Sequence, residues 1–343
     1  LGLVDALSAV GIKAFGPHAQ AAQLEGSKAY AKEFMEKHQI PTAKYARFDQ
    51  VEKAIAALPS FGLPVVIKAD GLAAGKGVVI AFTANEAVDA LKEMLSGNRF
   101  GSAGHTVVIE AFLRGTEASQ LCLVSGDTIV PLESAQDYKR AFDNDEGPNT
   151  GGMGTYSPSR LYTPELTERI RETILEPFVK GLRVDGITYN GLIFIGLMLE
   201  DGEPSVIEFN VRFGDPETQS LMMRLESDLL AVLLATVEGQ LRPELLKWSD
   251  TRAVCVVMAA GGYPDQYKKY MPILGADAYD NSEAIQIFHA GTVCKNDQLV
   301  SQGGRILNVA AAGETMDEAR ALAYDAVAKV EICESFYRSD IGL

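Results

Sequence analysis

The sequence predicts a protein of several domains in the mixed α/β and α+β classes. Its 343 residues exceed the usual size of one domain, and a hydrophobic content of 47% is ordinary for a globular protein. Apolar residues recur at helical spacing in some stretches and form short β-branched runs in others. The composition changes near Leu241, so we expect a small β-rich carboxy-terminal domain at 241–343.

The first residues predict part of a βα unit. The chain begins at Leu1 inside a pattern typical of an amphipathic helix, and a strand-like run follows at 12–15. We interpret residues 1–18 as the remnant of an amino-terminal α/β domain whose first segment precedes Leu1. Residues 19–48 are predicted to form a linking helix and a strand.

A glycine-rich loop lies between two β-branched runs at 65–80, which predicts a β-hairpin. Lys68 ends the first run, and the loop contains Gly71, Gly75, Lys76 and Gly77. Glycines let the backbone approach a phosphate and offer its N–H groups, and the ammonium groups supply positive charge. The loop is not a Walker A loop, because glycine follows Lys76. A nucleotide polyphosphate would fit here; a tight hairpin with two solvated lysines is the alternative.

Helical patterns at 51–58 and 85–95 flank this hairpin, so we interpret residues 49–113 as a lid subdomain. A buried strand is predicted to lead to Glu110, and Glu117 follows the next turn. Such a turn can present backbone groups to an adenine edge and a carboxylate to a ribose. Two solvated loop glutamates are the alternative.

Residues 114–240 are predicted to carry the chemistry. A long polar stretch at 134–159 contains Asp137 and Lys139 and ends in a glycine cluster. A loop of this length is uncommon unless it is functional or disordered, and we favour a substrate loop. A long helix at 164–182 and two apolar strands follow.

The second of those strands brings three polar residues to one face. Glu208, Asn210 and Arg212 alternate with apolar residues, and side chains two apart in a strand share a face. Glu208 and Asn210 offer hard oxygen ligands of the kind that Mg²⁺ takes beside phosphate oxygens and water. A salt bridge between Glu208 and Arg212 is the alternative.

Charge, cysteines and histidines narrow the function classes. A formal net charge of −15 disfavours nucleic acids and anionic membranes as partners. No run of ~18 apolar residues appears, and we expect a cytoplasmic protein. The widely spaced cysteines predict buried thiols without a zinc site or disulfides. The four histidines show no arrangement for covalent catalysis, and we interpret each as structural or exposed.

Five long motifs in the same order closely resemble the glycinamide ribonucleotide synthetase family (phosphoribosylamine-glycine ligases) of the ATP-grasp superfamily. They lie at 23–28, 66–77, 134–140, 147–154 and 206–217. The resemblance runs over essentially the whole chain. It implies an ATP-grasp fold preceded by a partial Rossmann-like piece. It also implies a ligase of purine biosynthesis that joins glycine to 5-phosphoribosylamine through glycyl phosphate, giving glycinamide ribonucleotide, ADP and phosphate.

The resemblance also implies roles for particular residues. ATP would be held by Lys28, Lys68, Gly71, Gly75, Lys76, Gly77, Glu110, Phe112, Leu113 and Glu117. Mg²⁺ or Mn²⁺ would be bound by Glu208 and Asn210. The two small-molecule substrates would be bound by Asp137, Lys139, Arg212, Gly214 and Asp215, with Arg212, Asp137 and Lys139 as the expected catalytic residues. We expect a monomer or a weak homo-oligomer.

Two other functions stay open at this point. The first is a different ATP-grasp carboxylate-amine ligase, against which the motifs at 147–154 and 206–217 argue. The second is a truncated ATP-binding module without turnover, against which Lys28, Lys68 and the pair Glu208 and Asn210 argue.

Overall fold

The computed structural model describes residues 2–71, 77–96 and 105–343. The chain divides into two compact units, each built from several segments. Unit 1 contains Leu1–Leu132, Thr163–Arg212 and Leu230–Pro243. Unit 2 contains Glu133–Tyr162, Phe213–Leu229 and Glu244–Leu343. The finer division predicted from the sequence stays a prediction.

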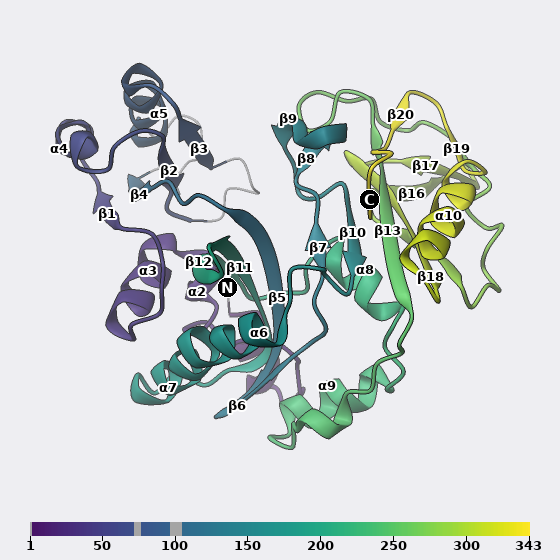
Figure 1. Cartoon of the computed structure of the whole chain (residues 1–343), viewed down its shortest axis with the longest axis horizontal. Coiled ribbons are helices and arrows are strands. Elements are labelled where there is room, and N and C mark those ends of the chain that lie inside the picture. Colours follow the sequence, from purple (N-terminus) through teal and green to yellow (C-terminus); the bar gives the residue numbers. More distant parts are fainter. Residues whose placement is uncertain (1, 72–76, 97–104) are drawn as a thin grey trace. The chain divides into compact units, whose positions relative to one another are not determined.

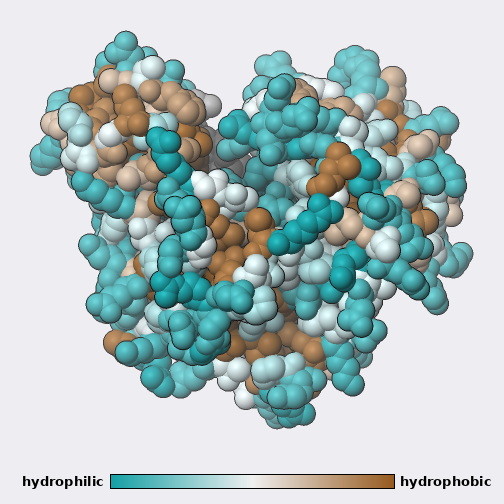
Figure 2. Space-filling model, viewed as in Figure 1, coloured by the Kyte–Doolittle hydropathy of each residue, from teal (hydrophilic) through white to brown (hydrophobic). Residues whose placement is uncertain are grey.

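The first sheet of unit 1 contains the hairpin expected at 65–80. Its strands, in the order β1-β4-β2-β3, are antiparallel and comprise β1 (Tyr45–Phe48), β4 (Val107–Ala111), β2 (Val65–Ala69) and β3 (Val78–Ala81). One face of this sheet is buried. Ile67 of β2 and Ile109 of β4, which lie opposite each other on that face, form a core with α4 (Val51–Ala57) and α5 (Ala84–Leu95). The surface around α4, α5 and β3 also shows apolar residues among hydrophilic ones (Figure 2), and Phe82 is 62% exposed.

The second sheet of unit 1 has the order β12-β11-β5-β6 (Figure 1). Its strands are β5 (Thr116–Ser125), β6 (Thr128–Pro131), β11 (Asn190–Glu200) and β12 (Glu203–Asn210). The other helices of this unit include α1 (Leu3–Ala9), α2 (Gln23–Gly26), α3 (Lys28–Lys37) and α9 (Leu229–Val237). Phe209 of β12 packs on Phe178 with ring centroids 5.3 Å apart, which joins this sheet to the long helix predicted at 164–182.

That long helix is not uniform. It runs as α6 (Pro164–Ile170), a π-helical turn (Arg171–Leu175) and α7 (Glu176–Val184). Pro177 has no N–H, so it cannot donate to the carbonyl of Thr173 as an α-helix requires. The π turn ends at Leu175, two residues before the proline, and lies where the ladder of α-helical bonds is interrupted. Apolar periodicity alone does not reveal this change.

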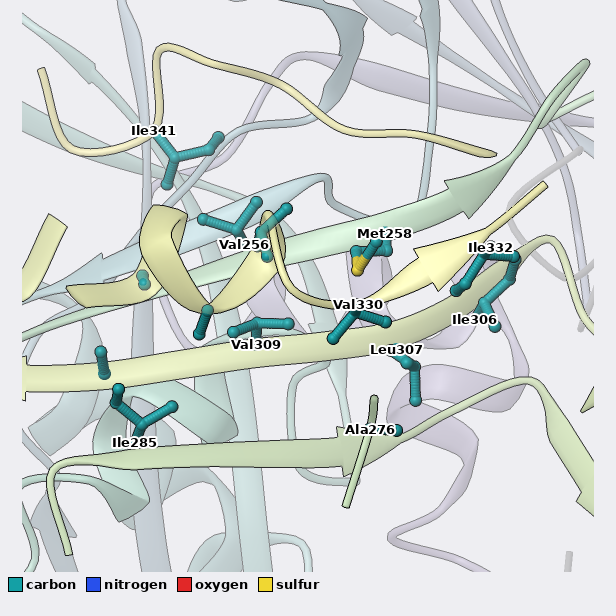
Figure 3. Close-up of a cluster of buried hydrophobic side chains, with 14 of the residues drawn as sticks. Val256, Met258, Ala276, Ile285, Ile306, Leu307, Val309, Val330, Ile332 and Ile341 are labelled. Atoms are coloured by element: carbon teal, nitrogen blue, oxygen red, sulfur yellow. The ribbon is translucent and has the colours of Figure 1, made fainter. Parts of the chain in front are cut away.

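Unit 2 is built on a sheet with the order β15-β18-β13-β10-β7, and β20 also pairs with β13. Its strands are β7 (Gln136–Asp137), β10 (Gly154–Ser157), β13 (Arg252–Ala260), β15 (Ile285–His289), β18 (Arg305–Gly313) and β20 (Ser335–Phe336). Apolar side chains from β13, β15 and β18 form its core with α10 (Met316–Val327). Figure 3 labels residues of the three strands in this core, among them Val256, Ile285 and Val309.

Smaller elements complete this unit. The paired strands are β8 (Arg140–Phe142) with β9 (Glu146–Asn149), β14 (Ile273–Leu274) with β19 (Glu331–Ile332), and β16 (Thr292–Lys295) with β17 (Gln298–Ser301). The helix α8 (Glu217–Met222) follows the predicted metal-bearing segment.

Three expectations were wrong. Residues 12–15 form no strand, and the polar stretch at 134–159 is not one irregular loop, because β7, β8, β9 and β10 lie in it. These strands are too short for period-two alternation to identify them.

Cys294 and Cys333 are exposed, whereas Cys122 and Cys255 are buried as expected, and all four are free thiols. No helix in the described ranges has the length and apolar character needed to cross a membrane.

Candidate functional site

The hairpin places Lys68 inside unit 1. Val66 lies opposite Glu110 across β2 and β4, so Lys68, two residues further along, is a diagonal neighbour of Glu110 on the same face. The Lys68 ammonium lies 2.9 Å from Glu110 Oε1 and donates to the carbonyl of Ile207 at 3.2 Å. The alternative of a solvated lysine is therefore wrong, because only 5% of the Lys68 side chain is exposed.

Lys28 is the first residue of α3, and residues that follow β2 of the hairpin contact this end of the helix. Ser27 and Asp70 cap this helix: the Ser27 hydroxyl accepts from the N–H of Tyr30, and the Asp70 carboxylate accepts from the N–H of Ala29 at 3.1 Å. The Lys28 ammonium donates to the carbonyl of Gly71 at 3.1 Å. Burial lowers the pKa of Lys28, against the opposing effect of the Glu208 carboxylate, so the two groups lie within electrostatic reach.

Glu110 is buried between two lysines, one of which the sequence analysis did not identify. Lys32 Nζ lies 2.9 Å from Glu110 Oε2 and donates to the Thr42 hydroxyl at 2.7 Å. Burial alone would raise the pKa of Glu110, but Lys68 and Lys32 outweigh it and keep that pKa below its usual value. Glu110 is therefore a buried anion, and not a solvated loop residue. Lys32 follows Lys28 by four residues on α3, which was the available signal.

Glu208 and Asn210 end β12 beside this cluster. The strand register shifts at Gly196/Leu197, opposite the segment that leads to Glu208, and bulges of this kind redirect side chains. Asn210 Nδ2 donates to Glu208 Oε1 at 3.3 Å, so both oxygen-bearing groups lie together. Among the described residues, no group of three or more His, Cys, Asp or Glu side chains could hold a metal. The pair fits Mg²⁺ or Mn²⁺ only with phosphate oxygens and water completing the coordination.

Arg212 lies beyond the last residue of β12, so the strand itself aligns two of the three polar residues expected on one face. Its guanidinium nevertheless returns to them, donating to Asn210 Oδ1 at 3.3 Å, and lies 3.6 Å from Glu25 of α2. Glu25 also accepts from the N–H of Val211 at 2.8 Å. Glu25 is thus a further residue that positions this segment.

The structure describes some, but not all, of the remaining residues expected to hold ATP. Phe112 and Leu113 are partly buried directly after β4, and Glu117 lies near the start of β5. The Gly77 carbonyl accepts from the N–H of Ala69 at 2.8 Å, which closes the hairpin. Gly75 and Lys76 lie outside the described residues.

Unit 2 contains a second polar cluster, in which Asp137 is 3% exposed by side chain. Asp137 of β7 forms an ion pair with Lys139, whose ammonium also lies 3.8 Å from Glu217 of α8. Burial raises the pKa of Asp137 to about 7, with Glu217 adding to the rise and Lys139 opposing it. A carboxyl with this pKa can accept or release a proton near neutral pH.

Asp215, a predicted substrate-binding residue, lies in an adjoining network with residues that no sequence motif indicated. Arg305 of β18 donates to Asp215 Oδ2 at 3.1 Å and to the carbonyl of Gly151 at 2.8 Å. Asn308 and Gln219 both donate to Asp215 Oδ1, at 3.3 Å and 2.8 Å. The buried Gly214 precedes Asp215. Arg305 and Asn308 belong to a strand whose apolar pattern gave no functional signal.

Several buried acceptors in this cluster have no hydrogen-bond donor among the described residues. They are Asp137 Oδ1, Gln219 Oε1 and Asn308 Oδ1. A buried acceptor without a donor costs free energy, on the order of 1–3 kcal/mol. Such a cluster suits a ligand that carries N–H or O–H donors, such as an amine or a sugar.

The sheets of unit 1 and its lysine cluster define a nucleotide-binding protein of the ATP-grasp class. The sequence model of the phosphoribosylglycinamide synthetase ATP-grasp (A) domain matches residues 26–218. That of the phosphoribosylglycinamide synthetase C domain matches residues 253–343. The chain therefore belongs to the phosphoribosylglycinamide synthetase family, which confirms the resemblance and the predicted fold class.

Individual relatives agree with this assignment. A phosphoribosylamine–glycine ligase from Allochromatium vinosum is 51% identical over 343 residues, which are 100% of this chain and 80% of that protein. A crystal structure of phosphoribosylamine–glycine ligase from Thermotoga maritima matches with a TM-score of 0.88 and 38% identity, over 95% of this chain and 81% of that one. The biotin carboxylase domain of a Hydrogenobacter thermophilus 2-oxoglutarate carboxylase, in complex with MgADP, matches in fold, with a TM-score of 0.73 and 18% identity over 97% and 72% of the two chains.

Proposed function

We propose that this chain is an ATP-dependent ligase that joins glycine to 5-phosphoribosylamine in purine biosynthesis. The products are glycinamide ribonucleotide, ADP and phosphate. The observation that carries the proposal is the 51% identity over all 343 residues to a phosphoribosylamine–glycine ligase. The buried lysines around Glu110 and the acceptor-rich cluster around Asp137 supply the kinds of group that this reaction needs.

In the first step, a glycine carboxylate oxygen attacks the γ-phosphorus of ATP, glycyl phosphate forms and ADP leaves. Lys28 and Lys68 bind the polyphosphate, with Gly71, Gly77 and the expected contacts Gly75 and Lys76 from the hairpin loop. Positive charge that is already positioned stabilises the charge on the transferred group. Arg212 and Gly214 bind the glycine carboxylate, for which a guanidinium fork is suited.

The base and the metal ion complete the nucleotide site. Glu110, with backbone groups of Phe112 and Leu113, binds adenine, and Glu117 binds the ribose. Glu208 and Asn210 hold Mg²⁺ or Mn²⁺, which neutralises phosphate charge when bound. The two side chains are in contact at the end of β12, where the Asn210 amide donates to Glu208 Oε1.

In the second step, the amine of phosphoribosylamine attacks the acyl carbon, phosphate leaves and the new amide nitrogen loses a proton. Asp137 accepts that proton, because a carboxyl with a pKa of about 7 is partly ionised at neutral pH. Lys139 keeps the Asp137 carboxylate in position through their ion pair, and Asp215 binds the phosphoribosyl substrate.

The proposal is tested by ADP release from Mg²⁺ and ATP, with glycine and freshly made phosphoribosylamine supplied separately and together. We expect sustained release only with both substrates. Lys68→Met should lower kcat/KM about 10²-fold by removing a phosphate contact, whereas Lys37→Met, an exposed change on α3, should not.

Other outcomes of this experiment decide between the alternatives. Tight ATP binding without release under any condition would support an ATP-binding module. Release with glycine and a different amine, or with a different carboxylate, would support another ATP-grasp ligase. A cytoplasmic location and a monomer or weak homo-oligomer stay predictions.

A further inference from the structure

We propose that Lys32 is a positioning residue of the nucleotide site, which acts through Glu110 to leave the charge of Lys68 available to a polyphosphate. The inference rests on the proposed ATP site at Lys28 and Lys68. It adds a residue that the sequence motifs did not single out, with a role that differs from direct contact with the nucleotide.

The contacts of Lys32 connect three elements of unit 1. Its ammonium bonds Glu110 Oε2 of β4 at 2.9 Å and donates to Thr42 Oγ1 at 2.7 Å. The Thr42 hydroxyl in turn donates to the carbonyl of Val206 on β12 at 2.6 Å. Lys32 therefore holds α3, the hairpin sheet and the strand of Glu208 together, with 2% of its side chain exposed.

The charges explain why two lysines are needed around one glutamate. Glu110 forms an ion pair with Lys68 through Oε1 and with Lys32 through Oε2, while Oε1 has no hydrogen-bond donor among the described residues. With Lys68 alone, Glu110 would cancel the positive charge that a phosphate requires. With Lys32 added, the group of three carries one net positive charge, and the interaction of Glu110 with Lys68 is shared with a second cation.

A purely structural role would predict a different pattern. A buried lysine that only fills space would matter equally for every ligand of the site. Burial lowers the pKa of Lys32 to about 8, with Glu110 opposing the fall, so the residue remains mainly charged at neutral pH. Its effect on binding should therefore depend on the phosphates of the ligand.

The test uses the full chain and compares Lys32→Met, Glu110→Gln, the double variant and Lys37→Met as a control. Lys37 lies on the same helix but pairs with Asp185 at the surface. For each protein, dissociation constants for ATP and adenosine are measured by calorimetry and ligand-observed NMR. The ratio of the two affinities isolates the contribution of the phosphates, even where Glu110→Gln weakens binding of the base. Thermal unfolding checks that each variant is folded.

We expect Lys32→Met to reduce the ATP-to-adenosine affinity ratio at least tenfold, and Lys37→Met to leave it unchanged. In the double variant, Lys68 no longer faces an unneutralised carboxylate, so the ratio should return to within about threefold of the wild-type value. If Lys32→Met alone does not fold, because a buried anion loses a partner, the double variant still decides.

A low ratio in the double variant would overturn the inference, because it would mean that Lys32 contacts the phosphates directly. Equal losses of ATP and adenosine in Lys32→Met would also overturn it in favour of packing. The Lys68→Met variant distinguishes a failure of the inference about Lys32 from a failure of the proposed ATP site. If Lys68→Met leaves ATP affinity unchanged, the proposed site itself is wrong; if only Lys32 has no effect, the site stands without it.

Discussion

Asp137 shows how burial adapts a single residue to proton transfer. It lies on a two-residue strand and is almost wholly buried. It forms an ion pair with Lys139, whose ammonium also lies near Glu217. Burial raises its pKa to about 7, Lys139 limits the rise, and charge repulsion from Glu217 adds to it. From sequence alone, Asp137 could be named as a candidate, but its burial could not, because it depends on strands far along the chain.

The raised pKa predicts the direction of the pH dependence. Below pH 7 the Asp137 carboxyl is mainly protonated and cannot accept a proton, so kcat/KM should rise with pH through about 7. Asp137→Asn should remove this limb and lower the rate about 10²–10⁴-fold. Initial rates between about pH 5 and about pH 9 measure the effect. A limb that persists in Asp137→Asn would assign it to another group.

Gly152 predicts a second effect at this site. Its φ is +112°, and a Cβ there would lie 2.5 Å from Pro216 Cδ and 2.6 Å from Asp137 Oδ1. Gly152→Ala should therefore strain the backbone and displace the carboxylate, reducing kcat by at least about tenfold while ATP affinity in unit 1 is kept. Gly186→Ala is the matched control, since its φ is also positive and no atom lies within 4 Å of the added Cβ. Equal effects of both changes on kcat would point to backbone strain alone.

At the scale of elements, features that depend on residues close in sequence could be predicted. Features that depend on contacts between residues distant in sequence could not. The hairpin could be placed because two β-branched runs and the glycines between them adjoin in sequence. The strands β7 and β10 could not, because β7 pairs with β10 and β10 pairs with β13, which lies far along the chain. Lys32 looks like an ordinary helix residue until Glu110 on β4 is placed beside it. Arg305 and Asn308 are linked to the site only by their hydrogen bonds to Asp215, which the sequence does not reveal.

The helix α5 gives a prediction at this scale. Thr83 and Glu86 form a capping box in which the Thr83 hydroxyl accepts from the N–H of Glu86. Thr83→Ala should lower the free energy of unfolding by about 1 kcal/mol. Thr167→Ala is the control, because the Thr167 hydroxyl on α6 donates to the carbonyl of Thr163 and caps no N–H. Urea unfolding followed by circular dichroism compares the two; a larger loss in Thr167→Ala would contradict the cap's role.

For the whole molecule, binding should appear as stabilisation. The net charge of −15 gives no general attraction for ATP, so capture depends on the local lysines and the cation. A ligand at 100 times its dissociation constant stabilises the folded state by about 2.7 kcal/mol. We expect ATP with Mg²⁺ to raise the unfolding temperature, and Glu208→Ala to remove the part of the shift that Mg²⁺ adds. Glu203→Ala, on the same strand but exposed, is the control. An undiminished Mg²⁺ effect in Glu208→Ala would remove Glu208 from the metal site.

The interleaved segments of the two units also set an order of events during protein synthesis. Thr155 of β10 pairs with Cys255 of β13, one hundred residues later in the chain. At ~5–20 residues per second, the ribosome needs roughly 5–20 s to make the strand that β10 awaits. Through that interval β7 and β10, with Asp137, lack their central neighbour in the sheet. The residue proposed to move a proton therefore acquires its buried setting only after all of unit 1 has been synthesised.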